Sequence, residues 1–382
     1  MLSTDLKESF ISLVRLGIGT SKDAKIPNEV NWTELKALAE MQGLSEVVLD
    51  GVEVLKETNT NLTDKPNSIP PIEFLLEWIG ETLQNESIYV AQQTDAVMMA
   101  DLFQKNGIRT YVLKGAVVSE CYPKPSHRQS ADMDCYLLPE QSNFDAWNLG
   151  NDLIKAQGFE VAYDFYKNST FCLTNLTVEN HLFFTPFRGN KRLAALEKWL
   201  QSQLKFESVE FRDCSNSSKL LSGSKIEGTE LWRPPVMVTA LFLIEHAYSH
   251  FLHEGLTWRM VLDWMLFSRK HNDEIDWSLL DEKIDEFGFR KFYDSYYRLG
   301  KYLVGEVQEF KSLRVQDQKM LDDIWAPLDL HESVRGWKGK LRLAGNTWRA
   351  RWKYKYFSED SMLKALWIQT KGVLFEKYPK LE

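Results

Sequence analysis

Two aspartates, Asp132 and Asp134, carry the most specific chemical signal in this sequence. The run from Met133 to Leu138 has the apolar character of a strand, and residues two apart in a strand project from the same face. Neighbouring carboxylates repel each other unless a cation lies between them. Because Mg²⁺ accepts carboxylate oxygens and keeps positions for water and phosphates, the pair predicts a site for Mg²⁺ or Mn²⁺.

The residues before this pair supply the positive charge that a polyphosphate needs. Lys114 and Gly115 follow an apolar run, 111–113, that is too short for a helix and indicates a buried strand. Gly115 lets the backbone turn tightly beside a ligand, and we expect a helix from Ala116 up to the prolines that follow. Lys114 and Arg128 can pair with phosphate groups. An exposed D-x-D turn beside a lone lysine is the alternative, but the combined pattern favours a metal and phosphate site.

This stretch resembles the uncharacterised bacterial nucleotidyltransferase family of the polymerase-beta-like nucleotidyltransferase superfamily. The resemblance covers roughly residues 95–270, and its motifs are Leu113-Lys114-Gly115, Tyr122-Pro123, Arg128 and Asp132-Met133-Asp134. It implies transfer of a nucleoside monophosphate from an NTP to an acceptor, with Mg²⁺ held by the two aspartates. The familiar superfamily members have Gly-Ser or Gly-Gly where this chain has Lys114-Gly115.

The resemblance also implies roles for residues in a later strand, expected over 177–185. The superfamily takes its third metal carboxylate from such a strand, and Glu179 stands at the matching place. Glu179 would be a metal ligand or the base that activates the acceptor hydroxyl. His181 shares its face and would contact phosphate or substrate, with a purely structural histidine as the alternative.

A helix after residue 235 carries three histidines on one face. His246, His250 and His253 are spaced by four and three residues. The resemblance implies contact with substrate or phosphate from His246 or His250, whereas structural hydrogen bonds and a zinc site are the alternatives. The zincin pattern H-E-x-x-H is absent, because Glu245 precedes His246.

Asp263 lies in the next helix, expected over 258–267. It matches an acidic position of the family, so the resemblance makes it a candidate site residue. An ion pair with Arg259, one helical turn earlier, is the alternative.

The arrangement of expected elements predicts three regions and an α+β fold. Residues 1–105 show helical patterns over 32–41, 46–55 and 70–106, and residues 231–382 are helical again. Between them, residues 106–230 alternate helices with short strands, which predicts a small mixed β-sheet. The expected strands cover 111–113, 133–138, 159–163, 170–174, 177–185 and 209–212, and the expected helices cover 139–157 and 191–206. We expect the active site between this sheet and the C-terminal helices.

The composition limits the classes of protein to which this chain can belong. Hydrophobic residues make up 44% of the 382 residues and charged residues 26%, an ordinary balance for a folded chain. The net charge of −8 argues against a molecule built as a whole to bind nucleic acid. The first residues do not resemble a signal peptide, and no apolar run is long enough for a membrane span. We therefore expect a soluble cytoplasmic protein.

The stretch Arg335–Lys355 has eight basic side chains, no acidic one and interleaved aromatic residues. Such a stretch can bind nucleic acid or an anionic membrane surface. Because the whole chain is acidic, a solvated or intramolecular basic face is the favoured interpretation.

Two rival functions stay open beside the transferase. One is a non-catalytic nucleotide-binding or regulatory protein that has kept the fold, although all three candidate carboxylates are present. The other is a nucleic-acid-binding protein that uses Arg335–Lys355. The sequence does not choose the acceptor, the NTP or the oligomeric state.

Overall fold

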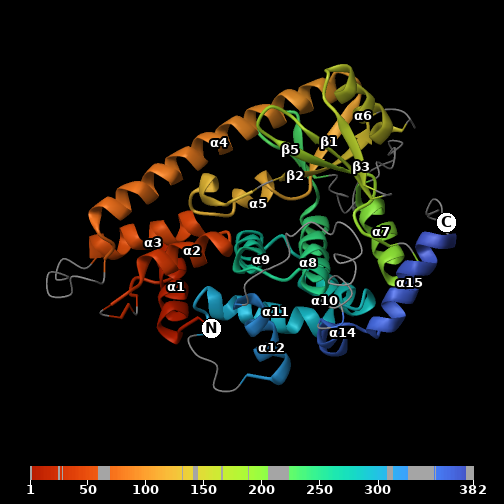
Figure 1. The fold of residues 1–382 in the computed structure, drawn as a ribbon. Helices are drawn as coiled ribbons and strands as arrows, with labels where there is room; N and C mark the ends of the chain where they lie inside the picture. The colour runs from red at the N-terminus through yellow and green to blue at the C-terminus, as the bar shows by residue number, and fades with distance from the viewer. Residues whose placement is uncertain are drawn as a thin grey trace, which may run out of the picture.

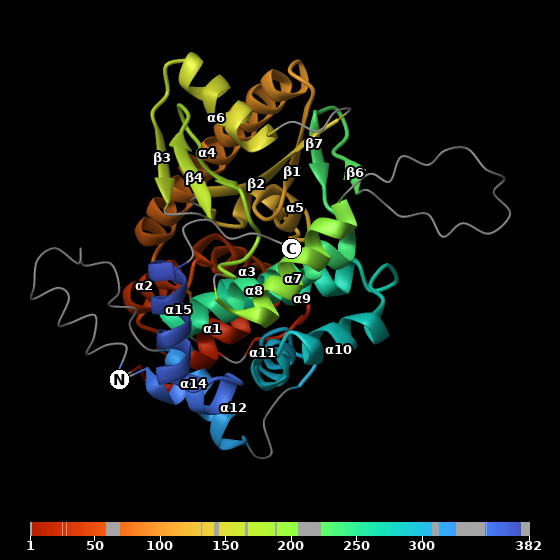
Figure 2. The ribbon, with the colours of Figure 1, turned by 90° about the vertical axis from the view of Figure 1, so that its right-hand side faces the viewer.

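A seven-stranded mixed sheet lies at one end of the molecule, and most of the helices lie together at the other end (Figures 1 and 2). The computed structural model describes residues 2–24, 26–27, 29–58, 69–130, 132–140, 145–164, 167–187, 189–204, 223–307, 313–325, 348 and 350–375. The expected α+β fold is confirmed. Within these residues, no helix combines the length and the apolar character that crossing a bilayer requires.

Four helices form the N-terminal region, and the first two begin at side chains that cap them. They are α1 (Thr4–Gly17), α2 (Trp32–Met41), α3 (Ser45–Thr58) and α4 (Ile72–Gln104). The side chain of Asn31 accepts a hydrogen bond from the backbone of α2, as an N-cap does. The 33-residue α4 follows two prolines and runs from the other N-terminal helices to the sheet (Figure 1).

The sheet joins parallel and antiparallel pairs in the order β3-β4-β5-β2-β1-β7-β6. Central β2 is antiparallel to β1 and parallel to β5, while β7 is parallel to β1. The strands β6 and β7 were not expected, because elements of two and three residues leave no periodic signal. The expected strand over 209–212 lies outside the described residues. The strands are β1 (Ile108–Val112), β2 (Asp132–Pro139), β3 (Val161–Asp164), β4 (Asn168–Cys172), β5 (Thr177–His181), β6 (Ser224–Lys225) and β7 (Leu231–Arg233).

Alternation along β2 separates an apolar face from a charged one. Met133, Cys135 and Leu137 are buried in a core with residues of α4 and of α6 (Ala146–Ala156). Asp134 and Tyr136 project from the opposite face. That face lies against α8 (Val236–His253), which follows Pro235 as expected. The aspartates therefore face α8 and not the apolar core under α4.

Two helices of the core differ from their expected length. The helix after Gly115 is only α5 (Ala116–Ser119), since Pro123 and Pro125 end its run and Pro125 opens a short 3₁₀ turn. The helix expected from residue 139 begins only at Ala146: β2 continues to Pro139, and the Asp145 side chain caps the helix by accepting from Asn148 N.

The helices at the two ends of the chain share one hydrophobic core. Phe10 of α1 packs edge-on against Trp325, which also contacts Trp258, with ring centroids 5.6 and 5.3 Å apart. Gln42 joins the same regions, since it donates to Ile324 O and accepts from the backbone of Trp258. The C-terminal half contains α7 (Lys191–Leu204), α9 (Trp258–Lys270), α10 (Trp277–Glu286), α11 (Arg290–Leu303), α12 (Val315–Trp325), α14 (Arg351–Phe357) and α15 (Met362–Phe375).

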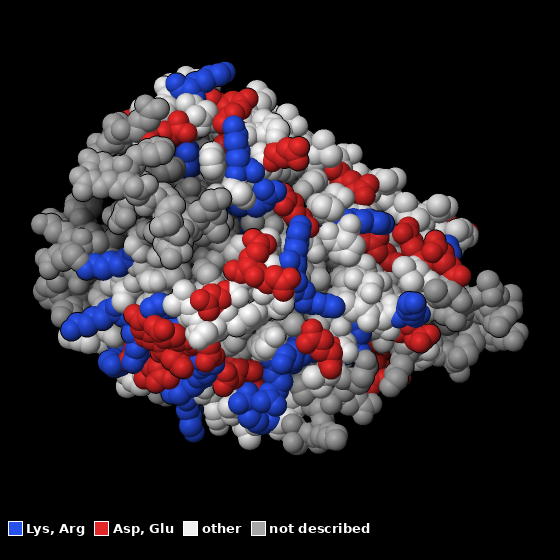
Figure 3. Space-filling view, turned by 180° about the vertical axis from the view of Figure 1, so that it is seen from behind, with Lys and Arg blue, Asp and Glu red and all other residues white. Residues whose placement is uncertain are grey.

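Only residues 348 and 350–355 of the stretch Arg335–Lys355 are described. Among them, Lys353 is buried and donates to Phe251 O at 2.7 Å and to Asp323 at 2.8 Å. On the face shown in Figure 3, acidic and basic side chains of described residues are interspersed. Lys353 thus has an intramolecular role, in line with the favoured interpretation, whereas most of the stretch lies outside the described residues and the alternatives of nucleic-acid or membrane binding stay untested.

Glycine permits the close crossing of α1 and α3. A Cβ at Gly51 would lie 2.0 Å from Leu13 O, whereas one at Gly80 in α4 would meet nothing within 4 Å. We expect Gly51→Ala to lower the free energy of unfolding by about 1–3 kcal/mol, because the helices must move apart. Gly80→Ala should raise it by about 0.5–1 kcal/mol. Urea unfolding followed by circular dichroism measures both, and equal effects would contradict this packing.

Candidate active site between the sheet and helix α8

Asp134 is the centre of the candidate site and is 1% exposed. Lys114 Nζ lies 2.9 Å from its Oδ2, and His181 Nε2 lies 3.0 Å from its Oδ1. Burial favours the neutral acid, but Lys114 and His181 outweigh it and hold the pKa of Asp134 well below its usual range. Asp134 is therefore a buried, ionised carboxylate.

The parallel register of β2 and β5 places Glu179 directly beside Asp134. His181, two residues further along β5, has its Nε2 3.7 Å from Glu179 Oε2. Its Nδ1 donates to Phe183 O at 3.2 Å, which leaves Nε2 to face the carboxylates. Burial opposes protonation of His181, but hydrogen bonds to Asp134 and Glu179 raise its pKa.

Asp134, Glu179 and His181 form a metal-capable group, here called the triad. One ligand atom from each lies within 4.8 Å of the other two, and in the described part of the chain no other three such side chains do so. Two carboxylates and an imidazole fit Mn²⁺ well, and the carboxylates suit Mg²⁺. Asp132 starts β2 on the same face, but it is partly exposed and lies outside the triad.

His246 of α8 completes the contacts of Lys114. Lys114 Nζ donates to His246 Nε2 at 3.1 Å, because an ammonium has no acceptor. Burial, with the nearby Lys114 and His250, lowers the pKa of His246 well below its usual range, so its imidazole is neutral. The ring of His250 lies 4.4 Å from that of His246, and His250 Nδ1 contacts Glu254 at 2.7 Å. The structure therefore brings His246 to the triad, with His250 behind it.

Gly115 turns the chain between Lys114 and α5 with φ of 72°. A Cβ there would have room, since its nearest neighbour, Asp132 O, would be 3.7 Å away. The requirement for glycine is thus conformational, as expected for a tight turn.

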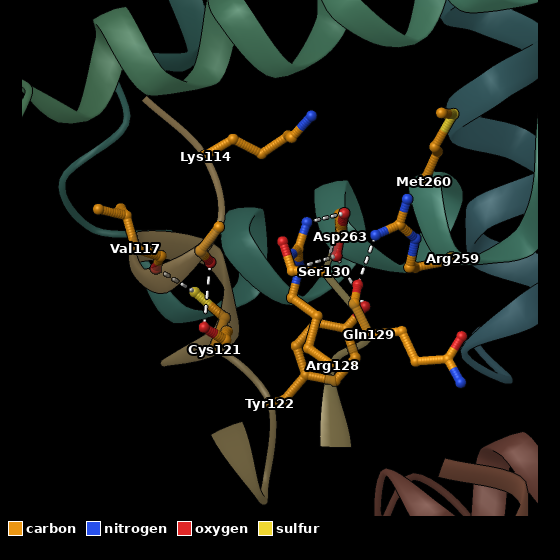
Figure 4. A network of polar contacts seen from close by, with 12 residues as sticks. Lys114, Val117, Cys121, Tyr122, Arg128, Gln129, Ser130, Arg259, Met260 and Asp263 are labelled. Atoms are coloured by element: carbon orange, nitrogen blue, oxygen red, sulfur yellow. Dashed lines mark hydrogen bonds and ion pairs between the residues drawn. The ribbon is translucent and has the colours of Figure 1, made fainter. Parts of the chain in front are cut away.

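Arg128 and Asp263 form a buried ion pair between the loop before β2 and α9 (Figure 4). Arg128 Nε and Nη2 each donate to one carboxylate oxygen at 2.8 Å, and the Tyr122 hydroxyl donates to Asp263 Oδ1 at 2.7 Å. Asp263 therefore pairs with Arg128 and not with Arg259, whose guanidinium donates to Gln129 O. The sequence did not indicate this pair, although the buried tyrosine hydroxyl needed a partner.

Cationic side chains gather at this pair. Lys114, Arg128 and Arg259 line a small pocket of about 10 Å³ beside Asp263 (Figure 4). Arg128 and Arg259 also line a cavity of about 400 Å³ between the N-terminal helices and α9. Arg128 Nη1 is buried and has no hydrogen-bond partner among the described residues. These cations make the region suited to an anion.

Residues 28–305 match the family described as uncharacterised nucleotidyltransferase. The chain belongs to this family. No curated protein and no solved structure matches the chain. Membership in this family implies a function in nucleotidyl transfer in general. The match includes all the site residues from Lys114 to Asp263 and most of the N-terminal helices, beyond the stretch that the motifs covered.

Glu245, which precedes His246 in α8, has a raised pKa. Glu245 is 3% exposed, and burial raises its pKa to about 7, although the charges of Lys167 and His181 oppose this and Glu197 reinforces it. No hydrogen bond to its carboxyl occurs among the described residues. In the sequence, Glu245 indicates only that a zincin motif is absent, because it precedes His246.

The buried ion pair predicts a large loss of stability when one partner is removed. Asp263→Ala should lower the free energy of unfolding by about 3–5 kcal/mol, because Arg128 would remain buried and unpaired. The control is Asp285→Ala, which removes an exposed partner 2.7 Å from Arg290 and should cost less than about 1 kcal/mol. Denaturant unfolding measures both, and a small effect at Asp263 would contradict a structural role for the pair.

Glu245 predicts a dependence of stability on pH. Its pKa is about 7 when folded against 4.5 ordinarily, so the folded protein favours the protonated form. That contribution is complete below the unfolded pKa and is lost as pH rises through the folded one. Relative to Glu245→Gln, the wild type should lose up to about 3 kcal/mol between about pH 5 and about pH 8. The free energy of unfolding of both proteins is measured across this pH range. If it falls with pH in Glu245→Gln as much as in the wild type, Glu245 is not the group responsible.

Proposed function

We propose that this protein is a polymerase-beta-like enzyme that transfers a nucleoside monophosphate from an NTP to an acceptor with Mg²⁺ or Mn²⁺. The observation that carries the proposal is the triad, formed by adjacent strands β2 and β5 beside three cationic side chains. Family membership supports nucleotidyl transfer in general. We assign the catalytic core to residues 106–230, with helical regions 1–105 and 231–382 around it, and we place the protein in the cytoplasm.

The metal would be held by Asp134 and Glu179, with Asp132 on the same face and His181 as a further donor. When bound, such a metal neutralises charge on the triphosphate and on the leaving pyrophosphate. Until a metal binds, His181 Nε2 donates the hydrogen bond that orients Asp134, and it must release that proton before it can be a ligand. The ionised state of Asp134, which the low pKa ensures, is the state that a cation requires.

The remaining cations would bind the triphosphate. Lys114 lies next to Asp134, and Gly115 permits the turn that would bring the backbone close to the triphosphate. Asp263 holds two nitrogens of Arg128 and leaves Nη1 for a phosphate oxygen. Asp263 is then a positioning residue and not a group that touches the substrate.

The reaction balances without a further reactant. A hydroxyl oxygen of the acceptor forms a bond to the α-phosphorus, and its proton passes to a carboxylate of the site. Glu179, whose side chain is 33% exposed, is the carboxylate best placed to receive that proton. The bond from the α-phosphorus to the bridging oxygen breaks, and its electron pair leaves with pyrophosphate. Because His246 is neutral, it places no competing charge next to Lys114, and the Lys114 ammonium can bind the phosphates.

We expect one or more NTPs to bind in the presence of Mg²⁺, with binding weakened at least about tenfold by Asp134→Asn and by Glu179→Gln. Titration calorimetry with ATP, GTP, CTP and UTP, each with and without Mg²⁺, measures this and identifies the donor. Glu179→Gln is the safer variant for folding, because Glu179 is partly exposed. Asp152→Asn, an exposed carboxylate on α6, is the matched control and should bind as wild type does.

Absence of metal-dependent binding for all four nucleotides would overturn the transferase proposal. Binding that survives both carboxylate variants would instead favour a non-catalytic nucleotide-binding protein.

A further inference from the structure

A second cavity, of about 480 Å³, lies where α7, α8, α14 and α15 meet. Its walls are mostly apolar and include Tyr248, Leu252 and Phe289. This volume is in the range of small-molecule sites. Glu245 is the one acidic residue of α8 that lines it; the residue is 3% exposed, and no described residue donates a hydrogen bond to its carboxyl. Other charged residues of the lining are Lys167, Arg192, Glu359 and Asp360.

An unpaired buried carboxyl is costly unless a ligand compensates it. Removing such a group from water is unfavourable when no partner replaces the solvent. A primary ammonium group offers three donors and a positive charge, and so is the chemical group that matches this carboxyl best. The apolar walls match a hydrocarbon or aromatic body attached to that amine.

The cavity adjoins the triad through α8. Glu245, Tyr248, Ser249 and Leu252 are spaced as one helical face and line the cavity, while His246 turns to Lys114 on the neighbouring face. Lys167 also lines the cavity and interacts electrostatically with both Glu245 and Glu179. A molecule in the cavity is therefore next to the proposed reaction centre, on the opposite side of α8 from the Arg128 pocket.

We propose that this cavity is the acceptor site, and that the acceptor is a small amphipathic amine whose ammonium group is bound by Glu245. That the bound amine is the acceptor rests on the proposed function, whereas the binding of an amine rests only on the cavity and Glu245. The acceptor hydroxyl then extends towards Glu179, where the α-phosphate of the NTP would lie beside the triad.

The probes are phenethylamine and phenethyl alcohol, which share one body and differ only in the polar group. Calorimetry on the full chain without nucleotide or metal should show binding of the amine at least about tenfold tighter than of the alcohol. Glu245→Gln should abolish that preference. Ser249→Trp should fill the cavity and remove binding of both probes, whereas the exposed Ser202→Trp on α7 is the matched control and should bind as wild type does.

Thermal unfolding of each variant shows whether it folds. If either Glu245→Gln or Ser249→Trp does not fold, the other variant still tests the site. No binding of the amine, or an unchanged preference in Glu245→Gln, would overturn the amine site. Repeating the titration with saturating Mg²⁺ and NTP tests the acceptor role: simultaneous binding supports it, and displacement by NTP overturns it. If no NTP binds at all while the amine does, the proposed function fails and the amine site stands.

Discussion

The buried charge of Asp134 is the constraint on which the site depends. A carboxylate that is 1% exposed must be paired, and its partners come from two other segments: Lys114 after β1 and His181 of β5. Lys114 in turn needs an acceptor and finds it in His246 of α8. One charge thereby fixes the relative positions of three strands and a helix. The same arrangement holds the carboxylates ionised and close together, which is the state that a divalent cation requires.

A second buried pair makes the helical part of the molecule a component of the site. Arg128 precedes β2, while Asp263 belongs to α9, and their two hydrogen bonds together with that of Tyr122 join the core to the C-terminal helices. Those helices share their hydrophobic core with α1 and α2. The N-terminal helices, which show no chemistry of their own, therefore support the position of Arg128 and form one wall of the cavity beside it.

Helix α8 divides the space around the triad into two chemically different parts. On one side lie the cations suited to phosphates, and on the other lies a cavity with mostly apolar walls, to which α8 contributes Glu245 and other segments contribute charged residues such as Lys167 and Arg192. Consecutive residues produce this division, because Glu245 and His246 are about 100° apart around a helix. Burial also gives them opposite shifts in pKa, which leaves His246 neutral and makes Glu245 harder to ionise.

The sequence by itself determined the local features of this protein. Alternation placed Asp132 and Asp134 on one strand face, Asn31 marked the start of α2, and Gly115 marked the turn at φ of 72°. These signals are short-range, since periodicity and capping report only what neighbouring residues do. Their order was also enough to indicate the family and the mixed sheet.

Only the tertiary structure decided which faces meet. The register of β2 and β5 brought His181 into the triad and left Asp132 outside it, and packing across 135 residues paired Arg128 with Asp263. The packing of the helices also placed Glu245 in the wall of a cavity. Contacts between segments this far apart in the chain depend on how whole elements pack, and one sequence carries no local pattern that specifies such packing.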